Sequence, residues 1–190
     1  MRRPFLKAFT LIELLMVIAI IGILTGILAP SFRDIQKSVK KAASRARFHE
    51  WAAAIEAFKQ EYGYYPWTNG SSTDVTLRLN AAGLGATFIE TLSGRNASGE
   101  PVTTGGNHRA LAFHHFSHGE FLHGVEADGQ SPSHLVDAFN NDAILVVIDA
   151  NGDGRVTAGS DKEIVHTGVA FWTLPRPPNI SPDMTVTSWE

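Results

Sequence analysis

The sequence predicts an α+β fold in which one long N-terminal α-helix packs on a small antiparallel β-sheet. A nearly unbroken apolar run extends over 9–29, and apolar residues then recur at helical spacing as far as Tyr62. Near the C-terminus, the β-branched run 143–148 is typical of a buried strand. These patterns divide the chain into a basic leader at 1–8, a transmembrane helix half at 9–29, an amphipathic helix half at 30–62 and a soluble α+β domain at 63–190.

The composition narrows the classes of partner. The 190 residues carry a formal net charge of −3, without the excess of Lys and Arg that is typical of nucleic-acid-binding proteins. Cysteine is absent, so neither a disulfide nor thiolate chemistry is available. With 44% hydrophobic residues, the composition is that of a globular protein with one membrane segment. We therefore expect membrane lipid and other proteins, and not nucleic acid, as partners.

The apolar run 9–29 is long enough to cross a bilayer, which takes about 20 helical residues. Pro30 closes the run. Glu13 lies near its start, where an ionised carboxylate costs about 2.5–3.5 kcal/mol on insertion scales. A helix that served only as an anchor would have no reason to carry this charge. We therefore expect Glu13 to have a partner on another molecule.

The residues KAFTLIELLMVIAIIG, at 7–22, resemble the N-terminal signature of type IV pilins and type II secretion pseudopilins. In that family, a prepilin peptidase cleaves before the Phe on the cytoplasmic side and methylates the new N-terminus. The resemblance implies cleavage between Ala8 and Phe9, with Ala8 where most members have Gly. It also places the family's acidic residue, fifth in the mature chain, at Glu13 and its helix-kinking proline at Pro30.

The resemblance implies a structural role and no enzymatic activity. It predicts a single-pass protein of the bacterial inner membrane, with its C-terminal domain in the periplasm. An ATP-driven assembly platform in that membrane would stack copies of the chain and other pseudopilins into a filament that drives protein export. The carboxylate of Glu13 would then accept the ammonium of Phe9 from a neighbouring subunit, a charge pair that sets the register of the filament.

Other interpretations of the N-terminal residues remain open. The chain could be a major or minor subunit of a type IV pilus. A secretory signal peptide or a plain signal anchor would also show basic residues before an apolar run. Glu13 would interrupt a signal peptide, and Pro30 is a poor start for a mature chain. The Tyr-Pro turn at 65–66 and the Ser-Trp pair at 188–189 resemble those of major pseudopilins and favour secretion.

The remaining elements follow in order from local patterns. Gly63 should end the long helix at Tyr62, since no Gly or Pro interrupts the helical pattern from Ser31 onward. Beyond it we expect a strand at 75–79, a short helix at 88–92, a loop at 95–107, a strand at 143–148 and one or two further strands at 163–174.

A histidine-rich stretch at 113–123 indicates a different class of function. His114 and His118 are four residues apart, and Glu120 and His123 follow, which would suit a transition metal in a membrane-tethered metal enzyme. The stretch lacks the His-Glu-x-x-His order of a zinc protease, and a glycine would interrupt a helix that carried the ligands. A structural segment before the sheet is therefore the preferred interpretation, and the metal enzyme is the remote alternative.

The loop at 149–156 has the pattern of a calcium site, because oxygen donors recur at alternate positions before a sharp glycine turn. The candidate ligands are the side chains of Asp149, Asn151 and Asp153, the carbonyl of Arg155, and Asp161. An EF-hand closes with a bidentate Glu at its twelfth position, which here is Ser160, so Asp161 would close the site one residue late. The alternative is a polar hairpin turn, for which Asn-Gly and Asp-Gly are strong formers.

Overall fold

The computed structural model describes residues 9–122, 134–175 and 184–189, with the backbone but not the side chains of 27–31 and 33. Ala8, on the leader side of the predicted cleavage, lies outside the described residues. The chain divides into two compact units, 1–39 and 40–190, and each is described by itself.

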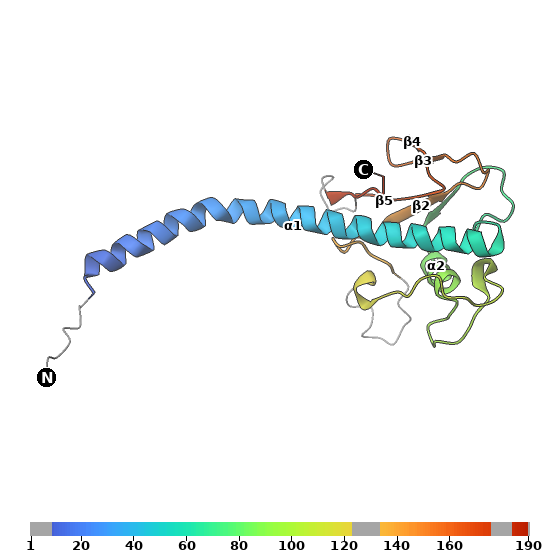
Figure 1. Ribbon diagram of the computed structural model, residues 1–190, viewed down its shortest axis with the longest axis horizontal. Coiled ribbons are helices and arrows are strands. Elements are labelled where there is room, and N and C mark those ends of the chain that lie inside the picture. Colours follow the sequence, from blue (N-terminus) through green and yellow to red (C-terminus); the bar gives the residue numbers. More distant parts are fainter. Residues whose placement is uncertain (1–8, 123–133, 176–183, 190) are drawn as a thin grey trace. The chain divides into compact units, whose positions relative to one another are not determined.

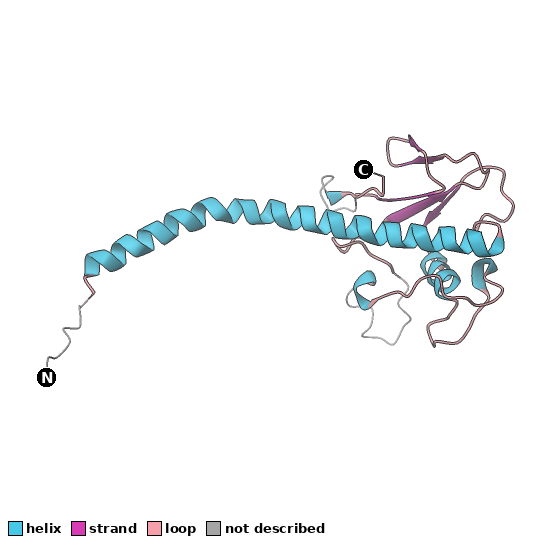
Figure 2. Cartoon of the chain, in the orientation of Figure 1, coloured by secondary structure: helices cyan, strands magenta, loops and turns pink. Residues whose placement is uncertain are grey.

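The first element, α1, is an α-helix over Leu11–Tyr62 (Figures 1 and 2). Its end confirms the predicted stop, because Gly63 has a left-handed φ of 79° and donates its N–H to the Lys59 carbonyl at 2.8 Å. Helical backbone continues through Pro30, whose side chain lies outside the described residues. The predicted kink at Pro30 therefore stays a prediction.

The part of α1 in the first unit is apolar and exposed around its whole circumference from 11 to 26. Leu11, Ile12 and Ile23, for example, are 80%, 74% and 66% exposed. Among the residues that the structure describes, no helix combines the length and the apolar character needed to cross a membrane. The transmembrane half expected at 9–29 is not confirmed and stays a prediction.

Two antiparallel sheets make up the β-structure of the second unit. The larger has the order β1–β2–β5, formed by β1 (Val75–Arg78), β2 (Ile144–Ile148) and β5 (Val169–Thr173). The smaller pairs β3 (Val156–Ala158) with β4 (Glu163–Val165). The strand expected at 143–148 is confirmed as β2, the central strand, and all but one of its residues are buried. The region 163–174 contains two strands that belong to different sheets.

The core lies between α1, the larger sheet and α2 (Leu84–Ser93), which confirms the predicted short helix. Within the second unit, Figure 1 shows the sheet on one side of α1 and α2 on the other. Trp51 of α1 joins the two layers, since its ring centroid lies 5.8 Å from those of Phe88 in α2 and Phe171 in β5. Full burial of a side chain such as Phe88 stabilises the fold by about 1.5–3 kcal/mol.

Short 3₁₀ turns interrupt the segment between α2 and β2, namely η1 (Thr104–Gly106) and η2 (His118–Glu120). Apart from η1 and a single bridge between Arg95 and Pro101, the predicted loop at 95–107 is confirmed. At the C-terminus, Thr187 pairs with Trp172 on the outer edge of β5. This pairing covers an edge that would otherwise present unpaired backbone groups.

Candidate functional site

The N-terminus of α1 brings the carboxylate of Glu13 back onto Thr10. The backbone N–H and the hydroxyl of Thr10 both donate to Glu13 Oε2, at 2.9 and 2.8 Å. The Glu13 N–H donates to the Thr10 hydroxyl at 3.3 Å, which completes a capping box. Glu13 therefore has a partner in its own chain, whereas the sequence analysis expected one only on another molecule. The Thr-x-x-Glu spacing is the signal that would have revealed it.

The cap uses only one of the two carboxylate oxygens. Both hydrogen bonds to the Glu13 side chain end on Oε2, and within the described part of the chain Oε1 accepts none. A carboxylate has about four acceptor positions. Glu13 can therefore cap its own helix and accept a further donor, so the expected pairing with Phe9 of a neighbouring subunit stays a prediction.

The loop after β2 satisfies its side-chain oxygens with its own backbone. Asp149 accepts the N–H groups of Gly152 and Gly154 at 2.7 and 2.8 Å. Asn151 accepts the Asp153 N–H at 2.8 Å, and Asp153 accepts that of the next residue at the same distance. These bonds are those of a polar turn. Asp149 Oδ1 also accepts the Asp153 N–H at 3.2 Å, so both of its lone pairs are used. The bonded oxygens Asp149 Oδ2, Asn151 Oδ1 and Asp153 Oδ1 accept one N–H each and keep a lone pair that a cation could use.

The remaining candidate calcium ligands are less well placed. Arg155 follows the loop directly, and its N–H donates to Asp153. Asp161 lies in the turn between β3 and β4, so the length of β3 separates it from the loop. Among the described residues, no group of three or more His, Cys, Asp or Glu side chains is placed to hold a metal ion. The calcium site therefore stays a prediction.

Asp74 is a carboxylate near this loop that the sequence analysis missed. Val75 pairs with Ile148 in the antiparallel register of β1 and β2, which brings Asp74 to the same end of the sheet as Asp149. Burial raises the pKa of Asp74, and the charges of Asp149 and Asp153 raise it further. Its Oδ1 is buried without a hydrogen-bond partner among the described residues. Only strand pairing brings these groups together, so no local pattern could have indicated it.

The histidine-rich stretch contains a closed hydrogen-bond network around Glu120, which is 4% exposed. Its Oε2 accepts from Trp51 Nε1 at 2.7 Å and contacts His114 Nε2 at 2.9 Å. Its Oε1 accepts from the backbone N–H and the hydroxyl of Ser117 at 2.7 and 2.8 Å. Both oxygens are thus used within the fold, which supports the structural interpretation of this stretch.

The structure gives less about the other members of the expected metal cluster. His118 lies in η2, and His123 lies outside the described residues. Burial alone would raise the pKa of Glu120, but the hydrogen bonds from His114, Ser117 and Trp51 together lower it to about 2. The carboxylate is therefore ionised and internally paired at neutral pH, as in a structural anchor.

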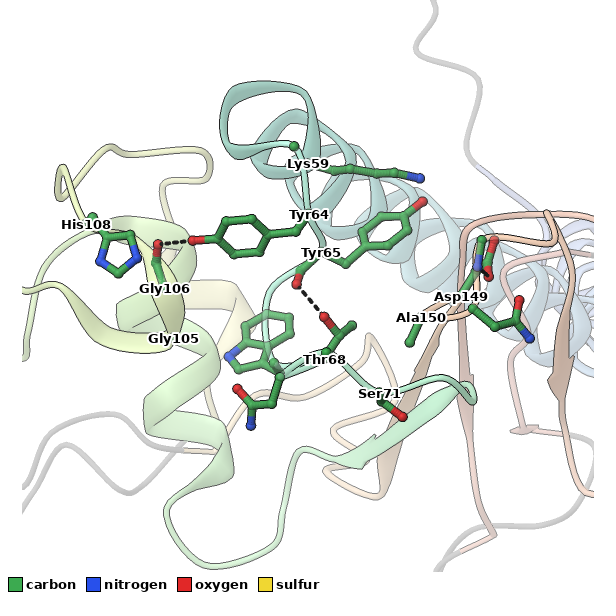
Figure 3. A pocket seen from close by; sticks show the side chains of 16 residues that line it. Lys59, Tyr64, Tyr65, Thr68, Ser71, Gly105, Gly106, His108, Asp149 and Ala150 are labelled. Atoms are coloured by element: carbon green, nitrogen blue, oxygen red, sulfur yellow. Dashed lines mark hydrogen bonds between the residues drawn. The ribbon is translucent and has the colours of Figure 1, made fainter.

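A cleft of about 610 Å³ lies beside the C-terminal end of α1. Figure 3 shows Tyr64 and Gly106 on one side of it and Asp149 on the other. Thr68 and Ser71 lie between these two sides. The loop that was expected to bind calcium thus forms one wall of the cleft, which the sequence analysis did not anticipate.

Comparison with known proteins gives a match at the N-terminus. A family model described as the prokaryotic N-terminal methylation motif matches residues 7–29. The chain carries a type IV pilin-like signal. No curated protein and no solved structure matches the chain. The signal contains the predicted cleavage position between Ala8 and Phe9, together with Glu13.

The fold agrees with this type IV pilin-like signal. A long N-terminal helix is followed by a short helix and small antiparallel sheets, as the sequence predicted. This α+β arrangement is consistent with a pilin-like fold. The signal points to a structural subunit that is processed by prepilin peptidase and assembles with other pilin-type subunits.

Proposed function

We propose that the chain is a structural subunit of a type II secretion pseudopilus. The observation that carries this proposal is the methylation motif at 7–29, which coincides with the exposed apolar start of α1. A helix that is apolar on all sides needs lipid or other protein around it. In our proposal, residues 9–29 lie in the inner membrane before assembly, and the second unit is in the periplasm.

Processing and assembly follow from the same residues. Prepilin peptidase would cleave between Ala8 and Phe9 and methylate the new amino group. An inner-membrane platform would then move the helix from lipid into a filament, where helices of neighbouring subunits replace the lipid contacts. The ammonium of Phe9 would donate to Glu13 Oε1 of a neighbour while Thr10 holds Oε2. This arrangement compensates two charges that would otherwise be unpaired in a dry environment.

The choice of secretion over a pilus has its own basis. It depends on the likeness of the turn at 65–66 and of the Ser188–Trp189 ending to those of major pseudopilins. In this structure Trp189 packs near Trp172, with ring centroids 6.3 Å apart, and donates to Glu163 at 2.8 Å. Trp189 is therefore packed and hydrogen-bonded within the domain, as we would expect of a structural element that pseudopilins share.

The test begins with the chain recovered from its native membrane. Intact mass and N-terminal sequencing should show a chain that begins with N-methylated Phe9. A mature chain that begins at Met1 or Pro30 would overturn the assignment. Deletion of the gene should then abolish export of proteins into the medium while any surface pili remain. Loss of surface pili with normal export would assign the subunit to a type IV pilus instead.

We also propose that the turn at 149–155 binds calcium, and that Asp74 moves in as an additional ligand when the ion binds, since in the described part of the chain these carboxylates are not placed around a common point. The supporting observation is that strand pairing brings Asp74 to the same end of the sheet as Asp149, where burial and then the charges of Asp149 and Asp153 raise the pKa of Asp74. A divalent cation would relieve the repulsion between these charges, and oxygen ligands are those that calcium prefers. Calcium binding would also hold the adjacent wall of the cleft in place.

A further inference from the structure

The cleft in Figure 3 has the size of a ligand-binding site, because its volume of about 610 Å³ falls within the usual range of about 300–1,000 Å³. Three segments of the second unit form it, namely the turn that follows α1, the turn at 105–108 and the loop at 149–152. The type IV pilin-like signal belongs to the first unit. The cleft therefore calls for an explanation other than processing or helix packing.

The lysine and the carboxylate in the lining are both engaged within the protein. The ammonium of Lys59 lies 3.9 Å from the centroid of the Tyr65 ring, in a cation–π contact. Asp149 is only 4% exposed, and its carboxylate accepts backbone N–H groups of its own loop. A charged ligand would have to break these contacts to find a counter-charge. The lining therefore favours a neutral ligand.

Neutral hydrogen-bonding groups remain open to the cleft. Asn69 is exposed, and its side chain makes no hydrogen bond within the described part of the chain. Asn151 uses its amide oxygen for the Asp153 N–H, which leaves its NH₂ group as a donor. Thr68 donates its hydroxyl to the Tyr65 carbonyl, so its hydroxyl oxygen keeps acceptor positions, whereas the Ser71 hydroxyl is bonded to Thr73. The cleft thus presents both donors and acceptors without net charge.

Aromatic side chains supply the apolar part of the lining. Tyr64 is 42% exposed, and its hydroxyl is held by a 3.0 Å hydrogen bond to the Gly106 carbonyl. Trp67 is fixed by stacking on Phe88, with centroids 5.1 Å apart, and by a 3.2 Å hydrogen bond from Nε1 to Thr91. Both aromatic residues are therefore held in place before a ligand arrives, which lowers the entropic cost of binding.

The backbone of this turn is strained at Trp67. Trp67 and Asn69 have left-handed φ values of 63° and 45°. A bulky residue with positive φ is a rare outlier, and such a conformation costs about 1–3 kcal/mol. Strain of this kind collects at binding sites, where it positions side chains toward a ligand. Trp67 and Asn69, which adopts the left-handed region readily, both line the cleft.

We propose that this cleft binds a neutral saccharide. A pyranose ring has apolar C–H faces and a rim of hydroxyls that donate and accept hydrogen bonds. The rings of Tyr64 and Trp67 match the faces, and the amides of Asn69 and Asn151 match the hydroxyls. Glycosidases need a pair of available carboxyl groups, whereas the lining has one carboxylate with its oxygens already bonded. The cleft therefore binds a saccharide without cleaving it.

The test uses the full mature chain in a detergent without a sugar headgroup, because alkyl glycosides would compete for the cleft. Calorimetric titration with cellotetraose and chitotetraose should give saturable binding to at least one of them. Asn69→Gly keeps the left-handed backbone but removes the amide, so it should weaken that binding by about 3- to 10-fold without loss of thermal stability. Asn140→Gly is the matched control, since Asn140 is also exposed with a left-handed φ of 63° but lies outside the cleft.

Further variants separate this proposal from its alternatives. Tyr64→Ala should weaken saccharide binding by about tenfold or more through loss of the ring face. Failure of both tetrasaccharides to bind at 10 mM would overturn the proposal. It would also be overturned by equal affinities of wild type and Asn69→Gly for the tetrasaccharides. None of these outcomes depends on whether the chain assembles into a pseudopilus.

Discussion

Trp51 Nε1 donates a 2.7 Å hydrogen bond to Glu120 Oε2 in the interior of the second unit. The donor lies on α1 and the acceptor in η2, so the bond ties the long helix to the segment that precedes the larger sheet. The same indole ring packs against Phe88 and Phe171. Trp51 therefore belongs both to the apolar core and to the hydrogen-bond network around Glu120. The charge of Glu120 should in consequence affect the stability of the whole domain.

We expect stability to fall steeply in acid because of Glu120. Its folded-state pKa of about 2 lies below its ordinary value of 4.5, so the unfolded state takes up the proton first as the pH falls. The stabilisation is complete above about pH 4.5 and is lost between pH 4.5 and 2. Its size is about 3 kcal/mol. Urea unfolding of wild type at a series of pH values would measure this loss.

Glu120→Gln provides the comparison for that measurement. The variant keeps the side-chain shape but removes the charge, so at pH 7 its free energy of unfolding should be about 2–4 kcal/mol lower than that of wild type. Near pH 2 the difference should shrink toward zero. The exposed Glu100→Gln variant should follow wild type at every pH. A constant difference between Glu120→Gln and wild type at all pH values would contradict the role of the charge.

Asp137 should have the opposite effect. It is 2% exposed, and burial raises its pKa to about 6, despite N–H groups of Asn141 and Phe139 that lower it. The folded state therefore holds this proton more tightly than the unfolded state, whose pKa is near 3.8. Stability should decrease as the pH rises from about 4 to 6 and then stay level.

The Asp137→Asn variant tests this directly. Its amide oxygen can still accept the two N–H groups that now bond to Oδ1, and the buried charge is gone. Unfolding experiments should find the variant more stable than wild type by about 1–3 kcal/mol at pH 7.5, with little difference at pH 4. A variant that is less stable than wild type at pH 7.5 would show that the charge is compensated.

For Glu13, two substitutions separate helix capping from subunit pairing. Glu13→Ala should leave insertion and cleavage intact but impair filament assembly, because it removes both Oε2 and Oε1. Glu13→Gln keeps an oxygen for Thr10 but lacks the charge for an ammonium, and we expect it to assemble as poorly as Glu13→Ala. Shearing and immunoblotting measure the filament yield. Normal yield from Glu13→Gln would restrict Glu13 to the capping of its own helix.

Calcium should stabilise the second unit through the turn at 149–155. A loop with few carboxylates and incomplete closure should have a dissociation constant of about 10⁻⁴–10⁻³ M. A hundredfold excess over that constant should add about 2.7 kcal/mol, so chelation should lower the Tm of wild type. Asp153→Ala should no longer respond to calcium, and magnesium should substitute poorly. Identical melting curves with calcium and with chelator would leave the loop as a simple turn.

The Asp74→Asn variant provides a second test of the same site, because its Tm can be measured without calcium. Asp74→Asn should raise the Tm of the chelated protein, because it removes the repulsion from Asp149 and Asp153. It should also weaken the response to calcium, if Asp74 contributes a ligand. The exposed Asp161→Asn variant serves as a control, and loss of the calcium response in it would instead support the closure first expected from the sequence.

The sequence by itself determined the features that depend on neighbours along the chain. Helical spacing and Gly63 were enough to place the end of α1 at Tyr62, because a helix is stopped by local backbone conformation. The run at 143–148 predicted β2 in the same way. The cap between Thr10 and Glu13 also follows from local spacing, since Thr-x-x-Glu is the pattern of a capping box.

Tertiary structure alone decided which distant residues meet. Asp74 faces the charges of Asp149 and Asp153 because β1 pairs with β2, and this register depends on which strand faces are buried. Glu120 is buried and hydrogen-bonded within the fold because packing brings Trp51 of α1 against it. The cleft beside α1 is likewise formed by three segments that lie far apart in the sequence, so no local spacing could predict it. Local hydrogen bonds and periodicity act over a few residues, whereas burial of apolar surface selects contacts irrespective of their separation along the chain.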